Sequence, residues 1–369
     1  MAKEEKKAPK LRFNGYTNDW ERKELNNILK INSGRDYKQL NSGSIPVYGT
    51  GGYMLSVNDK LSDTDAVGIG RKGTIDKPLY LKAPFWTVDT LFYCTSKENS
   101  DVKFIYLLFQ IINWKRYDES TGVPSLSKNT ISNIKTYVPK IKEQDYISKL
   151  FFSLDNTLQL HERKYEELTL IKKALLQKLF PKKDGFKPEV RYKNFNDAWE
   201  QRKLGDVVKT TIGEFVIKTK QKEDSPYPVY NGGTSYTGFY DDYNNDSNKI
   251  IISARGANAG FVNIVRQRYW AGNSCYSLSI LNNQEMDLDY LYQMLKQRQH
   301  LFTDFQQAAN IPSVSKKDVE TFKVYTPSFE EQKKIGLFLT RFDSLIDLHQ
   351  RKLEKLKQLK KFLLQNMFI

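Results

Sequence analysis

The sequence predicts an α+β fold in which two similar domains are each followed by a long helix. The first observation is an internal repeat, because segments 139–180 and 327–368 align without a gap at a constant offset of 188. Seventeen of the 42 aligned pairs are identical, which indicates a duplication. The second observation is that short runs of alternating apolar and polar residues, separated by Gly, Asn, Asp and Pro, precede each copy, as is typical of strands and turns.

The repeat divides the chain into consecutive parts, and its 369 residues are enough for two sizeable cores. We expect a flexible tail at 1–10, a first domain at 11–138, and a long helix with a linker at 139–185. A second domain at 186–326 and a C-terminal helix at 327–369 complete the chain. Each domain is therefore expected to carry its own helix.

Inside the domains, apolar runs and helical periodicity predict the elements in order. Residues 91–94 and 250–254 are predicted strands, because they are short apolar runs bounded by turn residues. Residues 101–114 and 287–305 are predicted helices near the end of each domain. The mixture gives the same α+β domain twice.

The two long helices carry apolar residues in alternating steps of four and three, which is the pattern of a coiled coil. Each covers about 36 residues, or roughly 54 Å of helix, and Pro139 and Pro327 precede them. The predicted seam includes Ile147, Phe151, Leu154, Leu158, His161 and Lys172 in the first helix, and Ile335, Leu339, Phe342, Ile346, His349 and Lys360 in the second.

The lysines of the seam predict how the helices pair. Parallel pairing would place Lys172 against Lys360 in a dry seam, which is a contact between like charges. Antiparallel pairing instead places these lysines against Phe342 and Leu154, past which the ammonium groups can reach water. We therefore expect an antiparallel pair that relates the two halves by a pseudo-two-fold axis.

The net charge of +15 favours a polyanionic partner, and nucleic acid is the commonest one. No apolar run approaches the roughly 20 residues needed to cross a bilayer, and the charged N-terminus does not resemble a secretory signal. Only two cysteines occur, Cys94 and Cys275, and neither has a metal-ligand spacing. A cytoplasmic protein without a membrane partner is the expectation.

No motif in the sequence predicts a catalytic centre or a bound cofactor or metal. The residues from Gly68 to Gly73 satisfy the dinucleotide-binding pattern G-x-G-x-x-G, but no helical pattern follows them, as that site requires. At the same offset of 184 that aligns Arg71 with Arg255 and Trp86 with Trp270, the glycines are not repeated. With three histidines in all, two of them in the seam, a histidine-based centre is not expected.

What the two domains repeat are loops suited to contact DNA. Glycine-rich loops follow a Pro-Val-Tyr strand in each, and glycine lets main-chain amides approach an anion closely, although a simple hairpin turn explains the glycines equally well. Arginine favours guanine and asparagine favours adenine, with a surface salt bridge as the alternative for the arginines. The candidate contacts are Tyr48, Gly51, Gly52, Arg71 and Lys72 in the first domain, and Tyr230, Asn231, Gly232, Gly233, Arg255 and Asn258 in the second.

A Ser-x-Ser-Lys motif also occurs in both domains, immediately before an apolar-periodic run. It fits an ordinary helix N-cap, and it equally fits a helix N-terminus with a lysine that binds a DNA phosphate. Its candidate residues are Ser125, Ser127, Lys128, Ser313, Ser315 and Lys316.

The order of these motifs, present twice, resembles the specificity subunit of type I restriction–modification enzymes over essentially the whole chain. The motifs that carry the resemblance are 19–21 and 199–204 near the domain starts, the Pro-Val-Tyr loops, and 123–128 and 311–316. The last two each lead through a proline to Glu-Gln and the heptad helix.

The resemblance implies two target-recognition domains that each read one half of a bipartite DNA sequence, while the paired helices set the spacer. It implies that this subunit has no catalysis of its own. Two methyltransferase subunits using S-adenosylmethionine, and restriction subunits using ATP and Mg²⁺, would join it on double-stranded DNA. A nuclease or methyltransferase with its own centre, and a stand-alone DNA-binding scaffold, are the two alternatives.

Overall fold

The computed structural model describes residues 7–182, 185–305 and 312–369. They form two compact units, of which unit 1 joins Met1–Glu162 with Arg351–Ile369 and unit 2 is Arg163–Gln350. Each unit therefore holds one domain together with part of both long helices, so the predicted boundaries at 138 and 326 do not coincide with the borders of the units. Residues 1–6 of the predicted tail and Ile311 of the predicted motif lie outside the described residues.

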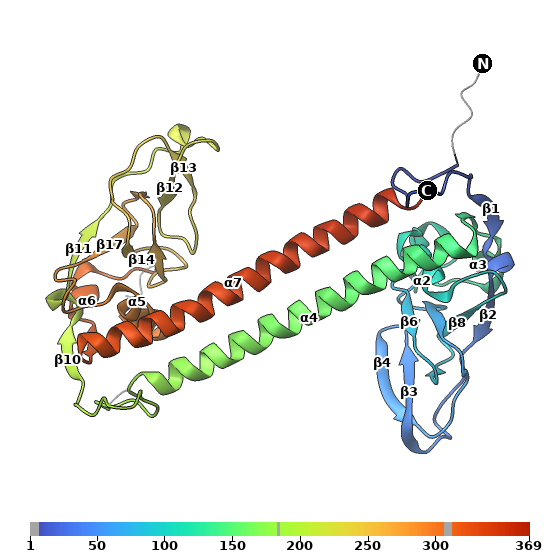
Figure 1. Ribbon diagram of the computed structural model, residues 1–369, viewed down its shortest axis with the longest axis horizontal. Helices are drawn as coiled ribbons and strands as arrows, with labels where there is room; N and C mark the ends of the chain where they lie inside the picture. Colours follow the sequence, from blue (N-terminus) through green and yellow to red (C-terminus); the bar gives the residue numbers. More distant parts are fainter. Residues whose placement is uncertain (1–6, 183–184, 306–311) are drawn as a thin grey trace. The chain divides into compact units, whose positions relative to one another are not determined.

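The described part of the domain of unit 1 is built from three small sheets and three short helices (Figure 1). One sheet has the strand order β2-β8-β5-β6, a second has the order β4-β3-β7, and the third pairs β1 with β9. The elements are β1 (Glu21–Glu24), α1 (Leu25–Ile28), β2 (Leu29–Ser33), β3 (Ser42–Gly49), β4 (Gly52–Val57), β5 (Ala66–Gly70), β6 (Leu79–Leu81), β7 (Trp86–Thr87), β8 (Leu91–Ser96), α2 (Val102–Ile111), a 3-10 turn (Trp114–Tyr117), α3 (Lys128–Asn133) and β9 (Lys135–Val138).

Unit 2 repeats this topology, with sheets ordered β11-β17-β14-β15, β13-β12-β16 and β10-β18. Its elements are β10 (Glu200–Lys203), β11 (Val208–Ile212), β12 (Tyr227–Tyr230), β13 (Gly238–Tyr240), β14 (Lys249–Ser253), β15 (Val262–Val265), β16 (Trp270–Ala271), β17 (Cys275–Ile280), α5 (Leu288–Gln297), α6 (Lys316–Thr321) and β18 (Lys323–Thr326), with 3-10 turns at Leu204–Asp206, Lys218–Lys220 and Gln299–Phe305. The prediction of one α+β domain present twice is confirmed.

The predicted strands at 91–94 and 250–254 are β8 and β14, and the predicted helices are α2 and α5. Both helices end earlier than predicted and continue as 3-10 turns. Asp101 and Asp287 cap them, since each carboxylate accepts a hydrogen bond from a main-chain amide of the first turn. Their apolar faces close the cores of the two domains.

The long helices are α4 (Ile141–Leu179) and α7 (Phe329–Asn366), with 39 and 38 residues. Their seam positions near the domains are buried, whereas Phe342, Ile346, His161 and His349 are half-buried. Each helix ends on an aromatic cluster: Phe368 packs on Trp20 in unit 1, and Phe180 packs on Trp199 in unit 2.

The helices run antiparallel in both units, as predicted. In unit 1, Asp155 pairs with Lys360 at 2.6 Å, and Glu162 pairs with Lys357 at 2.8 Å. The residue numbers therefore rise along α4 in the direction in which they fall along α7. In unit 2, Lys172 pairs with Asp343. Both Lys–Asp pairs join equivalent positions of the repeat, at the offset of 188.

These ion pairs correct the expected surroundings of the seam lysines. Lys172 and Lys360 do not simply extend past Phe342 and Leu154 to water, because each meets the aspartate that follows that residue. A carboxylate at the edge of the seam stabilises a half-buried ammonium better than partial hydration does.

A buried ion pair fastens the segment before each domain to its long helix. Arg12 Nε lies 2.6 Å from Glu143 Oε1 in unit 1, and Arg191 Nε lies 2.7 Å from Glu331 Oε1 in unit 2. The hydrogen bond to the carboxylate raises the guanidinium pKa of both arginines and is the largest effect on it. In unit 1 the same segment also reaches the end of α7, because Leu11 N donates to Asn366 O at 2.8 Å (Figure 1).

Candidate nucleic-acid interface

In unit 1, the loop that carries Arg71 and Lys72 is joined to the Ser-x-Ser-Lys segment. Gly73 N donates to Pro124 O at 2.8 Å, and Leu126 N donates to Arg71 O at 2.9 Å. Gly73 has a φ of 98°, a conformation that glycine adopts without strain. Two candidate groups that are about 50 residues apart in sequence therefore form one surface.

The joined loops line a cleft of about 720 Å³, whose lining includes all five candidates of these two loops. Arg71 and Lys128 are exposed and stand over the buried ring of Phe92, with their charged groups 6.0 and 5.8 Å from its centre. An aromatic face holds such cations favourably while their donors remain free for another acceptor. Asp89 and Glu119 also line the cleft.

The serines of the cleft are engaged within the chain. Ser127 caps α3, because its hydroxyl accepts a hydrogen bond from Thr130 N at 3.1 Å. The Ser127 hydroxyl also donates to Glu119, whose pKa is lowered by hydrogen bonds from Thr130 and Ser127. In unit 2, Ser315 caps α6 in the same way, with Asp318 closing the capping box. A carboxylate therefore already occupies both helix starts, which leaves Lys128 and Lys316 as the exposed cationic groups of the motif.

The glycine-rich loop of unit 1 is a hairpin turn. Gly49 pairs with Gly52 across the β3–β4 hairpin, and Gly52 has a φ of 109°. The tip lies beside the arginine loop, because a Cβ on Gly73 would stand 3.7 Å from Thr50 Oγ1. Tyr53, which pairs with Tyr48, is 63% exposed.

Unit 2 repeats the joined loops bond for bond. Gly256 N donates to Pro312 O at 2.9 Å, and Val314 N donates to Ala254 O at 2.9 Å. These bonds make Arg255 equivalent to Lys72 and Ala254 equivalent to Arg71. The alignment of Arg71 with Arg255 is therefore wrong by one residue, because the offset in this loop is 183 and not 184.

The second glycine-rich loop is longer, since β12 ends at Tyr230 and β13 begins at Gly238. Asn231 is partly committed, because its Oδ1 accepts a hydrogen bond from Ser274 N at 3.0 Å. Gly232 has a φ of 78°, and a Cβ there would stand 2.9 Å from Arg255 O. Glycine thus allows this loop to lie directly against the arginine loop, with Arg255 and Asn258 exposed beside it.

The residue beneath the cations differs between the units. Arg71 N donates to Thr90 O, and the equivalent Ala254 N donates to Ser274 O, so Phe92 corresponds to Tyr276. The Tyr276 hydroxyl donates to Val314 O at 3.2 Å, and burial raises its pKa. The Ser-x-Ser-Lys segment of unit 2 is therefore tied to β17 by a hydroxyl that Phe92 lacks.

Several residues of these surfaces escaped the sequence reasoning. Phe92 lies in β8 and Tyr276 in β17, and both stand beside other buried residues of their strands, so the sequence gave no sign of a role. Asp155 and Asp343 were visible as an identical pair of the repeat, which was the signal that could have found the seam ion pairs.

The exposed cations of these surfaces are groups suited to binding an anion. Burial raises the pKa of Cys94 and of Cys275 to about 12, so neither thiol is a ready nucleophile. Within 7–182, 185–305 and 312–369, no three His, Cys, Asp or Glu side chains form a cluster able to hold a metal. Over the same stretches, no helix is both long and apolar enough to cross a bilayer.

The family model of the type I restriction modification DNA specificity domain matches residues 17–170 and again residues 196–358. A putative type I restriction enzyme MjaX specificity subunit of Methanocaldococcus jannaschii is 25% identical over 280 residues, covering 69% of this chain and 65% of that protein. A putative type I specificity subunit of Mycoplasma pneumoniae is 27% identical over 155 residues, covering 42% of this chain and 41% of that protein. The chain thus spans less than two thirds of the length of these relatives.

A crystal structure of a type I restriction-modification S subunit from M. genitalium has the same fold. It superposes with a TM-score of 0.80 at 17% identity and covers 98% of this chain and 99% of that one.

Proposed function

The chain belongs to the family of type I restriction–modification DNA specificity domains, and from that membership we propose that it is a non-catalytic DNA-recognition subunit. Each domain reads one half of a bipartite target in double-stranded DNA. The observation that carries the proposal is the pair of equivalent surfaces, in which joined loops present exposed cations in both units. Lysines and arginines that neutralise phosphates give affinity, and the side chains that differ between the units give specificity.

The helix pair sets the spacer between the half-sites. Helices of 39 and 38 residues are roughly 58 Å long, which is more than the roughly 34 Å of one turn of DNA. Because ion pairs fix the register of α4 against α7, the pair acts as a ruler that is defined at the level of single residues.

Two methyltransferase subunits dock on this chain, and restriction subunits join the assembly. The repeat supports two equivalent docking places, because Leu160 and Leu348 are equivalent and exposed, as are Ile171 and Leu359. S-adenosylmethionine, ATP and Mg²⁺ are expected on these partner subunits, in the cytoplasm.

A map of methylated adenines in cells with and without this chain tests the proposal. We expect one bipartite sequence whose methylation depends on the chain, and the loss of methyltransferase co-purification when Leu160 and Leu348 are both replaced by Lys. The absence of any dependent sequence, or methylation by the purified chain alone, would contradict it.

An exchange of residues 186–326 for the second domain of a relative gives a sharper version of the test. We expect only one half-site to change, while the other half-site and the spacer stay as they were. A change in both half-sites would exclude two independent readers.

A further inference from the structure

We propose that Gln144 and Gln332 are positioning residues, each of which fixes its recognition domain to the start of its own long helix and thereby limits the spacer lengths that the protein accepts. The proposal rests on the proposed function. It concerns no contact with DNA, because both side chains are only 1% exposed.

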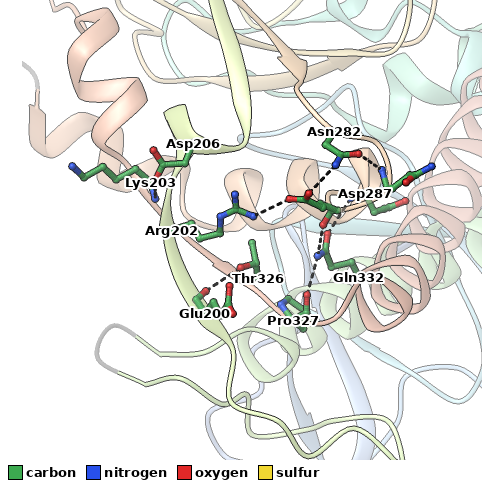
Figure 2. Close-up of polar contacts among 11 residues, drawn as sticks. Glu200, Arg202, Lys203, Asp206, Asn282, Asp287, Thr326, Pro327 and Gln332 are labelled. Carbon is green, nitrogen blue, oxygen red and sulfur yellow. Dashed lines mark hydrogen bonds and ion pairs between the residues drawn. The ribbon is translucent and has the colours of Figure 1, made fainter.

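The geometry is most complete in unit 2. Gln332 Nε2 donates to Pro327 O at 2.9 Å and to Glu285 O at 3.0 Å, and its Oε1 accepts from Asp287 N at 3.0 Å (Figure 2). Pro327 follows the last strand of the domain, Glu285 and Asp287 precede α5, and Gln332 lies in the first turns of α7. One amide therefore connects three elements.

Gln144 makes the same three bonds in unit 1. Its Nε2 donates to Pro139 O at 2.8 Å and to Asn99 O at 3.4 Å, and its Oε1 accepts from Asp101 N at 3.0 Å. Asp101 and Asp287 are the N-caps of α2 and α5. The glutamine thus holds the capping residue of one helix against the start of another.

Such a connection is directional in a way that apolar packing is not. Both donors of the amide and its acceptor are used, and all three partners are main-chain atoms, which side-chain rotation cannot move. An apolar contact tolerates a small rotation of the helix, whereas these bonds lose geometry when the angle changes. In a buried place, each broken bond leaves an unsatisfied polar group.

The neighbouring ion pairs serve a different connection. Arg12 binds Glu143 and also donates to Asn18 O, and Arg191 binds Glu331 and also donates to Asp197 O. These contacts hold the segment before each domain, and none of them reaches α2 or α5. The glutamines therefore link the N-cap of the helix that closes each domain to the start of the long helix. In unit 2, the Gln293–Asp343 and Thr340–Asp289 hydrogen bonds also join α5 to α7, farther along the long helix.

A rigid link and a loose link differ in their binding to two half-sites. When the domains are held rigidly, the effective concentration of the second domain is high at one spacer and falls steeply at others. When one link is loosened, the same effective concentration is spread over several spacers, so the best affinity falls and the tolerance rises. Binding to a single half-site does not depend on the link.

The test uses the full chain in complex with its methyltransferase subunits and fluorescent duplexes that carry the mapped half-sites. The duplexes have the native spacer, a spacer one base pair shorter or longer, or one half-site only. Gln332→Met keeps a long unbranched side chain without the amide, and Gln332→Glu keeps an acceptor and removes both donors. Gln159→Met, on an exposed side of α4, is the matched control.

For Gln332→Met we expect single half-site affinity to stay within about twofold and affinity at the native spacer to fall by about tenfold. Discrimination against the altered spacers should shrink from about tenfold to less than about threefold. Gln144→Met should behave alike, Gln332→Glu should show the same direction, and Gln159→Met should match the unchanged protein.

An unchanged spacer preference in Gln332→Met and Gln144→Met would overturn the proposal. Loss of single half-site binding in both variants would also overturn it, in favour of a purely structural role. If the unchanged protein itself shows no spacer preference, the proposed function fails and this inference fails with it. A spacer preference that both variants retain overturns the role of the glutamines alone.

Discussion

Beneath the cations of the first recognition domain lies Phe92, whereas Tyr276 occupies the equivalent place in the second domain and ties Val314 through its hydroxyl. Around these two residues the main-chain bonds are the same, from Gly73–Pro124 and Gly256–Pro312 to Leu126–Arg71 and Val314–Ala254. The joints, meaning the Arg–Glu ion pair and the buried glutamine at the start of each long helix, also repeat in both units. The ion pairs of the seam repeat in the same way. The difference is therefore confined to side chains and loop lengths that stand on one common scaffold.

The buried polar contacts that position the domains cannot change without loss of stability, whereas the exposed loops can. The joints and the seam position the domains, and a single altered partner would leave a buried charge or amide unsatisfied. The loops reach solvent, where a new side chain costs little stability and alters what is bound. A duplicated chain can thus keep one frame and acquire two specificities.

The largest expected effect tests whether the Arg–Glu ion pairs of the two units contribute equally to stability. Arg12→Ala and Arg191→Ala each leave a glutamate that is almost fully buried without its partner, so each should lower the free energy of unfolding by about 3–5 kcal/mol. Urea unfolding followed by circular dichroism measures both. Arg191→Leu with Glu331→Leu should recover a large part of the loss. A much larger loss of unfolding free energy in one variant than in the other would show that the two ion pairs are not equivalent.

The next effect tests whether the loops are separate readers. Arg71→Ala should cost about 1–3 kcal/mol of binding at the first half-site only, and Arg255→Ala a similar amount at the second only. Fluorescence anisotropy with one half-site altered at a time distinguishes the two. Each variant should also reduce the slope of log affinity against log salt by about 1 if its arginine binds a phosphate instead of a base. Equal losses at both half-sites would contradict separate reading.

A smaller effect probes the tyrosine itself. Tyr276→Phe removes the bond to Val314 O and makes the second domain resemble the first, so the free energy of unfolding should fall by about 1 kcal/mol. DNA affinity should change at the second half-site alone. Phe92→Tyr is the reciprocal variant, and it should leave the second half-site untouched.

The last effect is a dependence on pH that only unit 2 should show. Burial, together with Lys172, lowers the pKa of Lys296 to about 8, although Asp343 opposes the shift. The unfolded chain, with an ordinary lysine pKa of about 10.4, binds more protons in this window, so stability should rise between about pH 8 and 10.4. In Lys296→Gln this rise should disappear from urea unfolding measured at several pH values. A rise that persists in the variant would assign it to another group.

The frame could be predicted from the sequence because its signals are periodic. Heptad spacing and the two lysines were enough to give the antiparallel pair, and the offset of 188 gave the equivalence of the helices. The partners of Lys172 and Lys360 were missed because Asp155 and Asp343 stand beside the seam, where spacing alone assigns no contact.

The candidate DNA-binding surfaces were harder to predict because their geometry depends on hydrogen bonds between distant loops. The sequence brought Arg71 and Ser125 into one candidate set, but only the bonds from Gly73 and Leu126 place them at one cleft. The offset error at Arg255 has the same cause, since neighbouring Arg71 and Lys72 give an alignment no means to choose between them. The Gly-Gly sequences look alike, yet one closes a short hairpin and the other opens a longer loop.

The symmetric seam means that each helix is complementary to itself. Helix α7 carries both Asp343 and Lys360, and α4 carries both Asp155 and Lys172. Two antiparallel copies of α7 would therefore pair Lys360 of each with Asp343 of the other. A chain of half this length, with one domain and one helix, would encode a homodimer that reads a palindrome. If each domain reads one half-site, as proposed, the fusion of two halves in one chain allows the two half-sites to differ.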